Sequence, residues 1–305
     1  MINPRVASAN SLRDPHNDPR MSPPDLTIII VTHDSGKIIA SCLDTLPESQ
    51  RIIVLDNGSH DQTMSIASQY PRVEIVKNTN IGYGRAANIG LSMVKTPYAL
   101  LLNPDVVIKG EAMKTILDCA GRHPEAGIIG GRMFHKANGR IIYERAYDFD
   151  EHGFCYSDWV IGALMLLRME AFRRVGIFDE EIFLFFEETD LFMRFERAGF
   201  RIGVCRDAMA EHSLGNTAPP SLRVTKIRAW HYAWSHGYYY TKHYGLGFSA
   251  RKSLPSAFEH LVNAIKYSLL MRREKTVRNL FALLGVVSFF IGVKAFRKDA
   301  VGRLT

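Results

Sequence analysis

Hydrophobic runs and helically spaced apolar residues alternate along the first two-thirds of the chain. A short aliphatic run that stops at a polar turn indicates a buried strand, whereas apolar residues three or four positions apart indicate a helix. The runs predict strands at 26–31, 51–55, 73–76, 99–102, 128–129 and 159–168. The spaced positions predict helices near 38–46, 64–67, 80–95, 110–122 and 192–198. This alternation predicts an α/β fold in which helices flank a Rossmann-like, mostly parallel sheet.

The two ends of the chain differ in composition from this alternating part. Residues 1–24 are rich in Pro, Asn, Ser and Asp and lack the apolar stretch of a signal peptide, so we predict a disordered N-terminal tail. Residues 25–245 are predicted to form the catalytic domain. Residues 246–305 are predicted to form a basic, partly apolar helical extension.

The extension carries an uncharged run at 280–293 between groups of Lys and Arg. A membrane-spanning helix needs about 20 apolar residues, so this run is too short to predict a span. A basic segment that lies partly buried in an anionic membrane surface fits better, and we predict peripheral attachment to a membrane. The alternative is a helix that packs on the catalytic domain or on a second copy of the chain in a homodimer.

Composition supports a large globular core and an anionic partner. The 305 residues are 47% hydrophobic, and the formal net charge is +7, with the bases concentrated after about residue 220. The four cysteines are widely separated and show neither a zinc-binding nor a disulfide pattern, so we expect reduced thiols. No nucleic-acid-binding motif accompanies the basic residues, and nucleic acid is not expected as a partner.

Polar and acidic residues follow three of the predicted strands, at residues 31, 55 and 102. The carboxyl ends of parallel strands meet at one edge of a sheet, where ligands bind. Asp56 follows the second strand, and Asp105 stands just past the strand at 99–102. Such an edge suits a nucleotide base and ribose, together with a divalent cation on a diphosphate. For either acid alone, turn formation or helix capping remains an alternative.

Three acids, Glu187, Glu188 and Asp190, come directly after the aromatic run 183–186. Acids at the start of a helix can simply favour its N-terminus. Here the aromatic side chains would place part of the cluster in a partly desolvated cleft, which raises a carboxylate pKa and permits general-base catalysis. The cluster therefore predicts a catalytic site, and His212, after the last core strand, is a further candidate.

Several short motifs follow one another in a fixed order between residues 26 and 245. They are Val31-Thr32-His33-Asp34-Ser35, Asp56-Asn57-Gly58-Ser59-His60-Asp61, Asn80-Ile81-Gly82, Asn88, Leu102-Asn103-Pro104-Asp105, Gly176-Ile177-Phe178-Asp179-Glu180 and Phe186-Glu187-Glu188-Thr189-Asp190-Leu191. Together they resemble the family 2 glycosyltransferases of the GT-A fold, in the bacterial rhamnosyltransferase-like branch. The resemblance implies an inverting transferase that moves a sugar from a nucleoside diphosphate to an acceptor hydroxyl.

The resemblance also implies roles for the matching residues. The nucleotide sugar would contact Thr32, Asp34, Asp56, Asn57, Asn80, Gly82, Asn88 and Asn103. Asp105 and His212 would hold Mg²⁺ or Mn²⁺, and Glu188 would be the base, with Glu187 and Asp190 as alternatives. We further expect acceptor contacts from Trp159 and Gly162. The sequence departs from the family pattern twice, because Asn103 replaces the first Asp of the D-x-D motif and Glu188 stands where Asp is usual.

We expect dTDP-rhamnose or a UDP-sugar as donor and a glycan or lipid-linked acceptor, in surface polysaccharide synthesis on the cytoplasmic face of a membrane. One alternative is a catalytically silent scaffold that binds sugar nucleotides. A nucleotidyltransferase is disfavoured, because no glycine-rich loop with Arg or Lys follows the first strand. NAD binding is also disfavoured, because the glycines at 82, 84 and 90 lack the dinucleotide-binding spacing.

Overall fold

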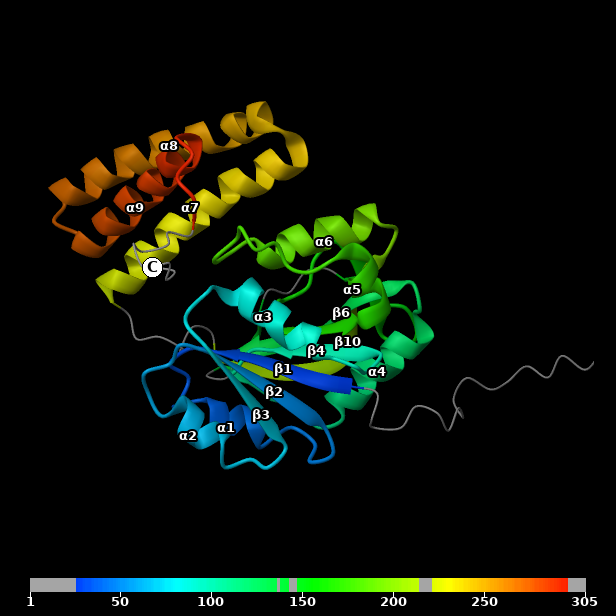
Figure 1. The fold of residues 1–305 in the computed structure, drawn as a ribbon. Coiled ribbons are helices and arrows are strands. Elements are labelled where there is room, and N and C mark those ends of the chain that lie inside the picture. Colours follow the sequence, from blue (N-terminus) through cyan, green and yellow to red (C-terminus); the bar gives the residue numbers. More distant parts are fainter. Residues whose placement is uncertain (1–25, 136–137, 143–146, 214–220, 296–305) are drawn as a thin grey trace, which may run out of the picture.

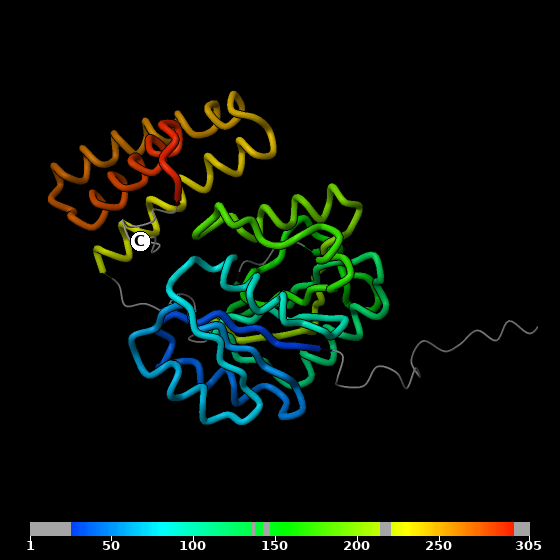
Figure 2. The backbone as a smooth tube through the Cα atoms, in the orientation of Figure 1, coloured from blue at the N-terminus to red at the C-terminus, as the bar shows by residue number. Residues whose placement is uncertain are grey.

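The computed structural model describes residues 26–135, 138–142, 147–213 and 221–295. Figure 1 shows a sheet flanked by helices and, beside it, a group of long helices from the C-terminal part of the chain. Figure 2 follows the chain from the blue and green sheet part into the yellow, orange and red helices. The predicted tail 1–24 and the end of the predicted extension, 296–305, lie outside the described residues.

Ten strands within the described residues form one sheet, whose main path is β3-β2-β1-β4-β9-β6-β10-β5. The strands are β1 Leu26–Thr32, β2 Arg51–Asn57, β3 Val73–Asn78, β4 Tyr98–Leu102, β5 Val106–Ile108, β6 Ala126–His135, β7 Ile141–Ile142, β8 Phe154–Ser157, β9 Leu164–Arg168 and β10 Arg201–His212. Strands β3, β2, β1 and β4 pair in parallel, as predicted. The other half is mixed, because β9 runs antiparallel to both β4 and β6.

Helices cover both faces of the sheet. They are α1 Ile39–Leu43, α2 Thr63–Ala67, α3 Tyr83–Ser92, α4 Ala112–Arg122, α5 Met169–Val175 and α6 Glu187–Arg197. Successive side chains of a strand point to opposite faces, so a strand covered on both sides must be apolar throughout. In β1, Ile28 and Ile30 pack with α1, α2 and α4, whereas Ile29 and Val31 pack with α3, α5 and α6. This arrangement explains the unbroken aliphatic run at 26–31.

The structure differs from the sequence predictions in the middle of the chain. The strand predicted at 159–168 is shorter, and β9 begins at Leu164. Residues 159–163 lie outside any strand, and the carbonyl of Ala163 accepts a hydrogen bond from the backbone N–H of Asn103. The expectation of reduced thiols is wrong for one pair, because Cys119 and Cys205 form a disulfide. These cysteines are 86 residues apart, so no local sequence pattern marks their proximity.

The last three helices pack against one another. They are α7 Leu222–Tyr244, α8 Leu246–Leu269 and α9 Arg273–Phe290. Ala233 of α7 packs with Ala282 and Val286 of α9 in a small core of their own. We call α7, α8 and α9 the C-terminal bundle. In the part of the chain that the structure describes, none of the helices has the length and apolarity needed to cross a membrane.

Candidate active site

The carboxyl ends of β1 and β2 place Thr32 beside Asp56. The two residues pair across the parallel strands, and both are buried. The Thr32 hydroxyl donates to Leu55 O at 3.3 Å and approaches Asp56 Oδ1 at 3.4 Å, while the backbone N–H of Ser59 approaches Asp56 Oδ2 at 3.4 Å. These are long hydrogen bonds, which leave acceptor capacity on the carboxylate. Asp56 therefore has the lone pairs to accept hydrogen bonds from a ligand at the sheet edge.

A side-chain network links Asn57 at the end of β2 to the start of α3. The Asn57 amide donates to Asn80 Oδ1 at 3.2 Å and to the carbonyl of Gly82 at 3.3 Å, and its oxygen accepts from the backbone N–H of Ile81 at 3.0 Å. Gly82 has a φ of 88°, and a Cβ there would collide with the carbonyl of Phe183. Glycine is therefore required where this loop meets the segment that leads to the acids. In this structure Asn57, Asn80 and Gly82 shape the edge of the site.

Asp34 and Asn88 take different positions around this edge. Asp34 has a φ of 50°, and its carboxylate accepts from the backbone N–H of His60 at 2.7 Å, which joins the turns after β1 and β2. The side chain of Asn88 is buried. Its amide nitrogen donates to the carbonyl of Phe178 at 3.0 Å, and its amide oxygen accepts from the backbone N–H of Phe178 at 2.9 Å. Asn88 thus fixes the loop before the acidic segment. Its predicted contact with the nucleotide stays a prediction.

Asp105 and His212 are brought together by β5 and β10. Asp105 follows β4 in the turn before β5, and β10 pairs antiparallel with β5 and ends at His212. Both side chains are buried, and His212 Nε2 lies 3.2 Å from Asp105 Oδ1. Among the residues that the structure describes, neither Asp105 Oδ1 nor His212 Nδ1 has a hydrogen-bond partner. Asn103 lies in the same turn, two residues before Asp105.

This pair fits a divalent cation. A buried carboxylate oxygen without a hydrogen-bond partner is energetically costly, and a cation held by Asp105 Oδ1 and His212 Nε2 would satisfy that oxygen. The described residues contain no cluster of three or more His, Cys, Asp or Glu side chains able to hold a metal. Two protein ligands are nevertheless typical where substrate phosphates and water complete the coordination of Mg²⁺. Asp105 and His212 alone would therefore need a bound ligand to supply further oxygen atoms to a cation.

The acidic segment is held in a strained conformation. Phe185 and Phe186 have φ angles of 67° and 70°, a left-handed region that costs energy for residues with a Cβ, and α6 begins directly after them at Glu187. Such conformations persist only where the surroundings impose them. The consequence is that the two glutamates project from a fixed turn at the end of a strained loop.

Glu187 and Glu188 share a desolvated environment. Glu187 is buried, its Oε2 has no hydrogen-bond partner in the described structure, and burial and then the Glu188 carboxylate raise its pKa well above the usual range. Burial also raises the pKa of Glu188. Glu188 is less buried than Glu187 and lies against Gly162, where a Cβ would collide with its carboxylate. Of the two side chains, Glu188 is the more exposed.

Asp190 is occupied by other side chains. It is fully buried, and Arg194 Nε binds its Oδ2 at 2.8 Å. Its Oδ1 lies 2.6 Å from Lys242 Nζ and 2.8 Å from His243 Nε2, both on α7. Three such partners occupy both carboxylate oxygens and leave little hydrogen-bonding capacity for a substrate. The structure thus favours a structural role for Asp190 and leaves the two glutamates as candidate bases.

The two expected acceptor residues lie on the turn before β9. Trp159 is partly buried and packs against the apolar core that contains α3, α5 and α6. Gly162 adjoins the Glu188 carboxylate, which only a residue without a side chain permits. Gly162 therefore borders the acid that we expect to act as base. No contact with an acceptor is tested by this geometry, so both assignments stay predictions.

Helix α7 supplies contacts to the acidic segment that the sequence did not predict. Lys242 Nζ also binds Asp179 Oδ2 at 2.6 Å, and Tyr238 donates to the same oxygen at 3.0 Å. Ser235 donates to the carbonyl of Leu184 at 3.0 Å, and the ring of His231 stacks on Phe183. The sequence has many His and Tyr residues between 231 and 244, but helical periodicity alone cannot show which other residues these side chains contact. The C-terminal bundle thus supports the loop that carries the acids.

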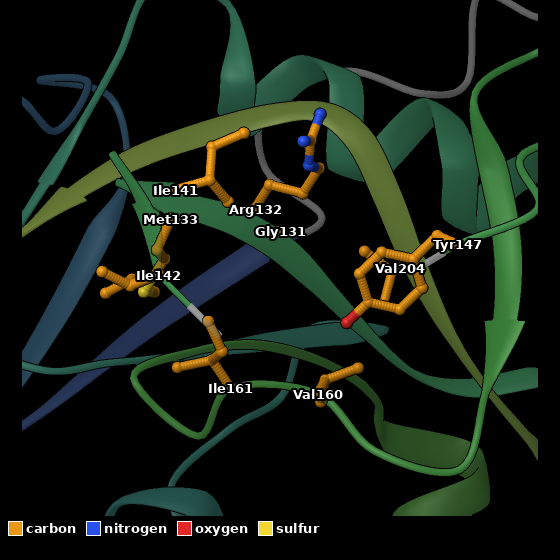
Figure 3. Close-up of a pocket in the computed structure, with 9 residues that line it drawn as sticks. All are labelled: Gly131, Arg132, Met133, Ile141, Ile142, Tyr147, Val160, Ile161 and Val204. Carbon is orange, nitrogen blue, oxygen red and sulfur yellow. The ribbon is translucent and has the colours of Figure 1, made fainter. Parts of the chain in front are cut away.

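A small hollow lies between β6, β7 and residues 160–161 of the segment before β9 (Figure 3). Its walls are mostly aliphatic, with Tyr147 and Arg132 at the rim of the drawn group. None of the nine residues labelled in Figure 3 is an acid or one of the predicted site residues. The hollow therefore contributes no chemistry to the site at the strand ends.

Comparison with known proteins identifies the family. A family model described as "Glycosyl transferase family 2" matches residues 27–195, from β1 to α6. The chain belongs to the family 2 glycosyltransferases. The match includes Asp56, Asp105 and both glutamates, whereas His212 and the C-terminal bundle lie beyond it. The family predicted from the sequence is thereby confirmed.

Curated relatives of this glycosyltransferase include bacterial rhamnosyltransferases. It is 27% identical over 219 residues to the N-acetylglucosaminyl-diphospho-decaprenol L-rhamnosyltransferase of Mycobacterium tuberculosis, covering 57% of this chain and 71% of the relative. It is 26% identical over 209 residues to the O-antigen chain rhamnosyltransferase RfbN of Salmonella typhimurium, covering 62% of this chain and 66% of the relative. These relatives support the rhamnosyltransferase-like branch predicted from the motifs.

Solved structures support the predicted fold. TarS 1-349 of S. aureus in complex with UDP-GlcNAc matches with a TM-score of 0.56 at 16% identity, over 92% of this chain and 95% of that chain. The mannosyltransferase PcManGT of Pyrobaculum calidifontis, in complex with GDP-Man and Mn²⁺, matches with a TM-score of 0.54 at 15% identity, over 91% of this chain and 88% of that chain. At these identities the likeness shows the fold alone, and the α/β fold class is confirmed.

Proposed function

We propose that this glycosyltransferase transfers a sugar, with inversion, from a nucleoside diphosphate to a hydroxyl group of an acceptor. The observation that carries the proposal is Glu188, a desolvated carboxylate of raised pKa beside Gly162 on the turn before β9. Because burial raises its pKa, the Glu188 carboxylate binds a proton more readily than an exposed glutamate does. Such a group suits deprotonation of a hydroxyl nucleophile.

The donor side of the proposed site is the edge formed by β1, β2 and the loop before α3. Asp56 and Thr32 would bind the base and ribose through hydrogen bonds. Asn57, Asn80 and Gly82 would set the position of the loop beside them, as their mutual hydrogen bonds suggest. Asp34, in the turn after β1, and Asn103, in the turn after β4, would border the same nucleotide.

Asp105 and His212 would hold Mg²⁺ or Mn²⁺. The cation would neutralise the charge that develops on the leaving diphosphate. The unpartnered Asp105 Oδ1 supports this assignment, and the imidazole of His212 favours Mn²⁺ over Mg²⁺, which prefers oxygen ligands. The fold relative PcManGT is titled as a complex with Mn²⁺.

The proposed chemical step combines the roles that we assign to these groups. Glu188 accepts the proton of the acceptor hydroxyl, whose oxygen attacks the anomeric carbon from the face opposite the diphosphate. The new glycosidic C–O bond forms as the bond to the diphosphate oxygen breaks, and the diphosphate leaves with that electron pair. One displacement inverts the anomeric centre. General-base catalysis typically contributes about 10²–10⁴-fold.

The relatives guide the choice of substrates. Because the similar proteins are rhamnosyltransferases, one of which is named for a diphospho-decaprenol acceptor, we propose dTDP-rhamnose as the first donor to test, before UDP-sugars. We propose a glycan or lipid-linked acceptor used in surface polysaccharide synthesis, at the cytoplasmic face of a membrane. The protein would then be peripherally attached to that membrane.

A donor panel tests the proposed function. Purified full-length protein is incubated with Mn²⁺, a lipid-linked diphosphate sugar acceptor and, in turn, dTDP-, UDP- and GDP-sugars. We expect nucleoside diphosphate release that depends on the acceptor for one donor class. Binding of a sugar nucleotide by calorimetry without release from any donor would support the silent scaffold instead.

The substitution Asp56→Ala should weaken donor binding more than it slows the chemical step. Removing a charged hydrogen-bond acceptor from the nucleotide site costs about 1.5–3 kcal/mol, or roughly 10- to 100-fold in Kd. Calorimetry with the nucleoside diphosphate of the active donor measures this loss. Asp118→Ala, at an exposed aspartate on α4, is the matched control. An unchanged Kd in Asp56→Ala would remove Asp56 from the nucleotide site.

A further inference from the structure

The outward face of α8 carries a continuous row of exposed apolar side chains. Its members recur at helical spacing and are Leu254, Phe258, Leu261, Val262, Ile265 and Leu269. Phe258 is 69% exposed, Ile265 55% and Leu269 80%. We call these six residues the α8 stripe. Contiguous apolar surface of this kind is rare on a soluble monomer and marks an interaction site.

The opposite face of α8 is already used within the C-terminal bundle. Ser249 and Ser253 are fully buried, with hydrogen bonds to the carbonyl of Gly237 and to His236 of α7. Ala264 is also buried. In Figure 1, α7 lies between α8 and the catalytic domain. The buried residues of α8 contact α7, and the exposed stripe lies on the other side of the helix. It is therefore free to meet another surface.

The apolar run at 280–293, which the sequence suggested as the membrane segment, is largely used inside the protein. Ala282, Gly285 and Val286 of α9 pack on α7, and a Cβ at Gly285 would collide with the carbonyl of Trp230. Trp234 donates from its indole N–H to the carbonyl of Val293 at 2.7 Å. One side of the run remains exposed, at Leu280, Leu284 and Val287, which are 42%, 41% and 45% exposed, and at Ile291 just after α9, which is 70% exposed. The stripe on α8 is the more exposed apolar surface.

The charge around the stripe favours an anionic surface. Residues 246–294 contain eight Lys and Arg and only two acids, Glu259 and Glu274. Arg251, Lys252 and Lys266 stand on α8 itself and are exposed. In the part of the chain that the structure describes, none of the eight bases forms an ion pair, so their charges are available to a partner. A second copy of the bundle would bring like charges together.

We propose that the α8 stripe is the docking surface for the anionic leaflet of a phospholipid bilayer, on which α8 lies flat. The apolar side chains would enter the region between headgroups and acyl chains, with the bases at the phosphates. The inference rests on the proposed function for the reason to be at a membrane, but docking itself needs no sugar nucleotide. Lys242 and His243 tie α7 to Asp190, so docking also sets the orientation of the active site toward the bilayer.

Flotation with vesicles tests this proposal on the full-length protein without donor or acceptor. We expect wild type to float with phosphatidylcholine–phosphatidylglycerol vesicles and to float far less with phosphatidylcholine alone. The double substitution Phe258→Glu with Ile265→Glu should lower partitioning at least about tenfold, because two apolar side chains that would enter the bilayer are lost. Leu284→Glu with Val287→Glu on α9 should lower it less. Ile177→Glu is the matched control, since Ile177 is 50% exposed on the catalytic domain.

Circular dichroism and sedimentation velocity on each variant separate docking from misfolding and self-association. Folded variants with the expected order of partitioning support the proposal. A wild-type protein that stays below the vesicles, or one that floats equally after the α8 substitutions, overturns it. The proposal is also overturned if the wild-type protein is a dimer that fails to float and if Phe258→Glu with Ile265→Glu converts it to a monomer. The stripe would then join two copies of the chain. Flotation without any donor turnover would refute the proposed function and leave docking intact.

Discussion

The substitution Glu188→Gln should lower kcat by about 10²-fold or more while leaving the Kd of the donor nearly unchanged. Glutamine keeps the size of the side chain beside Gly162 but cannot accept a proton from the acceptor hydroxyl. Single-turnover kinetics with the active donor separate this loss from binding. Glu196→Gln, at an exposed position on the same helix, is the matched control and should behave as wild type.

Glu187→Gln should have the smaller effect. Burial and then the neighbouring Glu188 carboxylate raise the pKa of Glu187 well above its usual range, which favours its protonated form. Glutamine resembles that protonated side chain, and it leaves Glu188 as the ionised member of the pair. If Glu187→Gln is the more damaging substitution, the base is Glu187 and the register of the family motif is displaced by one residue.

The pH dependence of kcat checks the same assignment. A base acts in its ionised form, so kcat should rise with pH through the pKa of Glu188. Because burial raises that pKa, the rise should lie above the ordinary glutamate value of about 4.3. The rise should be absent from the residual activity of Glu188→Gln. A rise that persists unchanged in this variant would assign the titrating group elsewhere.

The substitution Asp105→Ala should abolish metal-dependent turnover, with a loss of about 10²–10³-fold or more, as for removal of other groups that stabilise developing charge. Asp105 offers the only carboxylate of the pair with His212, so its removal takes away the charged ligand. Binding of Mn²⁺ to the protein with bound nucleoside diphosphate, followed by calorimetry or electron paramagnetic resonance, should weaken in parallel. Asp118→Ala again serves as the control.

Two results would contradict the metal assignment. One is wild-type turnover in Asp105→Ala. The other is full wild-type activity in excess EDTA. A variant that is inactive and also unfolded would be replaced by Asp105→Asn, which keeps the size of the buried side chain and removes its charge. Retained folding with a loss of Mn²⁺ binding in either variant supports the assignment.

The sequence predicted the first half of the sheet well for a physical reason. A strand buried on both faces is apolar along its length, and the runs at 26–31 and 99–102 match that pattern. The same rule predicted less in the second half. There β9 runs antiparallel between β4 and β6, and the turn at 159–163 is as apolar as the strand that follows, so its start at Leu164 could not be seen in the pattern.

The candidate site divides in the same way. The sequence by itself determined which residue types end the strands, because Asp56 and Asp105 directly follow apolar runs. It could not determine that Asp105 would meet His212, since that contact depends on β10 pairing with β5 across about 100 residues of chain. The Cys119–Cys205 disulfide was missed for the same reason.

The acidic cluster shows most clearly what each level decides. The sequence alone marked Glu187, Glu188 and Asp190 as candidates, because three acids follow an aromatic run. Only the tertiary structure separated them, since Lys242 and His243 of α7 occupy the carboxylate of Asp190, while the carboxylate of Glu188 lies against Gly162. It also decided which apolar residues remain exposed, because α7 covers one side of α9, whereas none of the described residues covers the outer face of α8. Hydrophobic periodicity tells which side of a helix is apolar, but only packing determines whether anything covers that side.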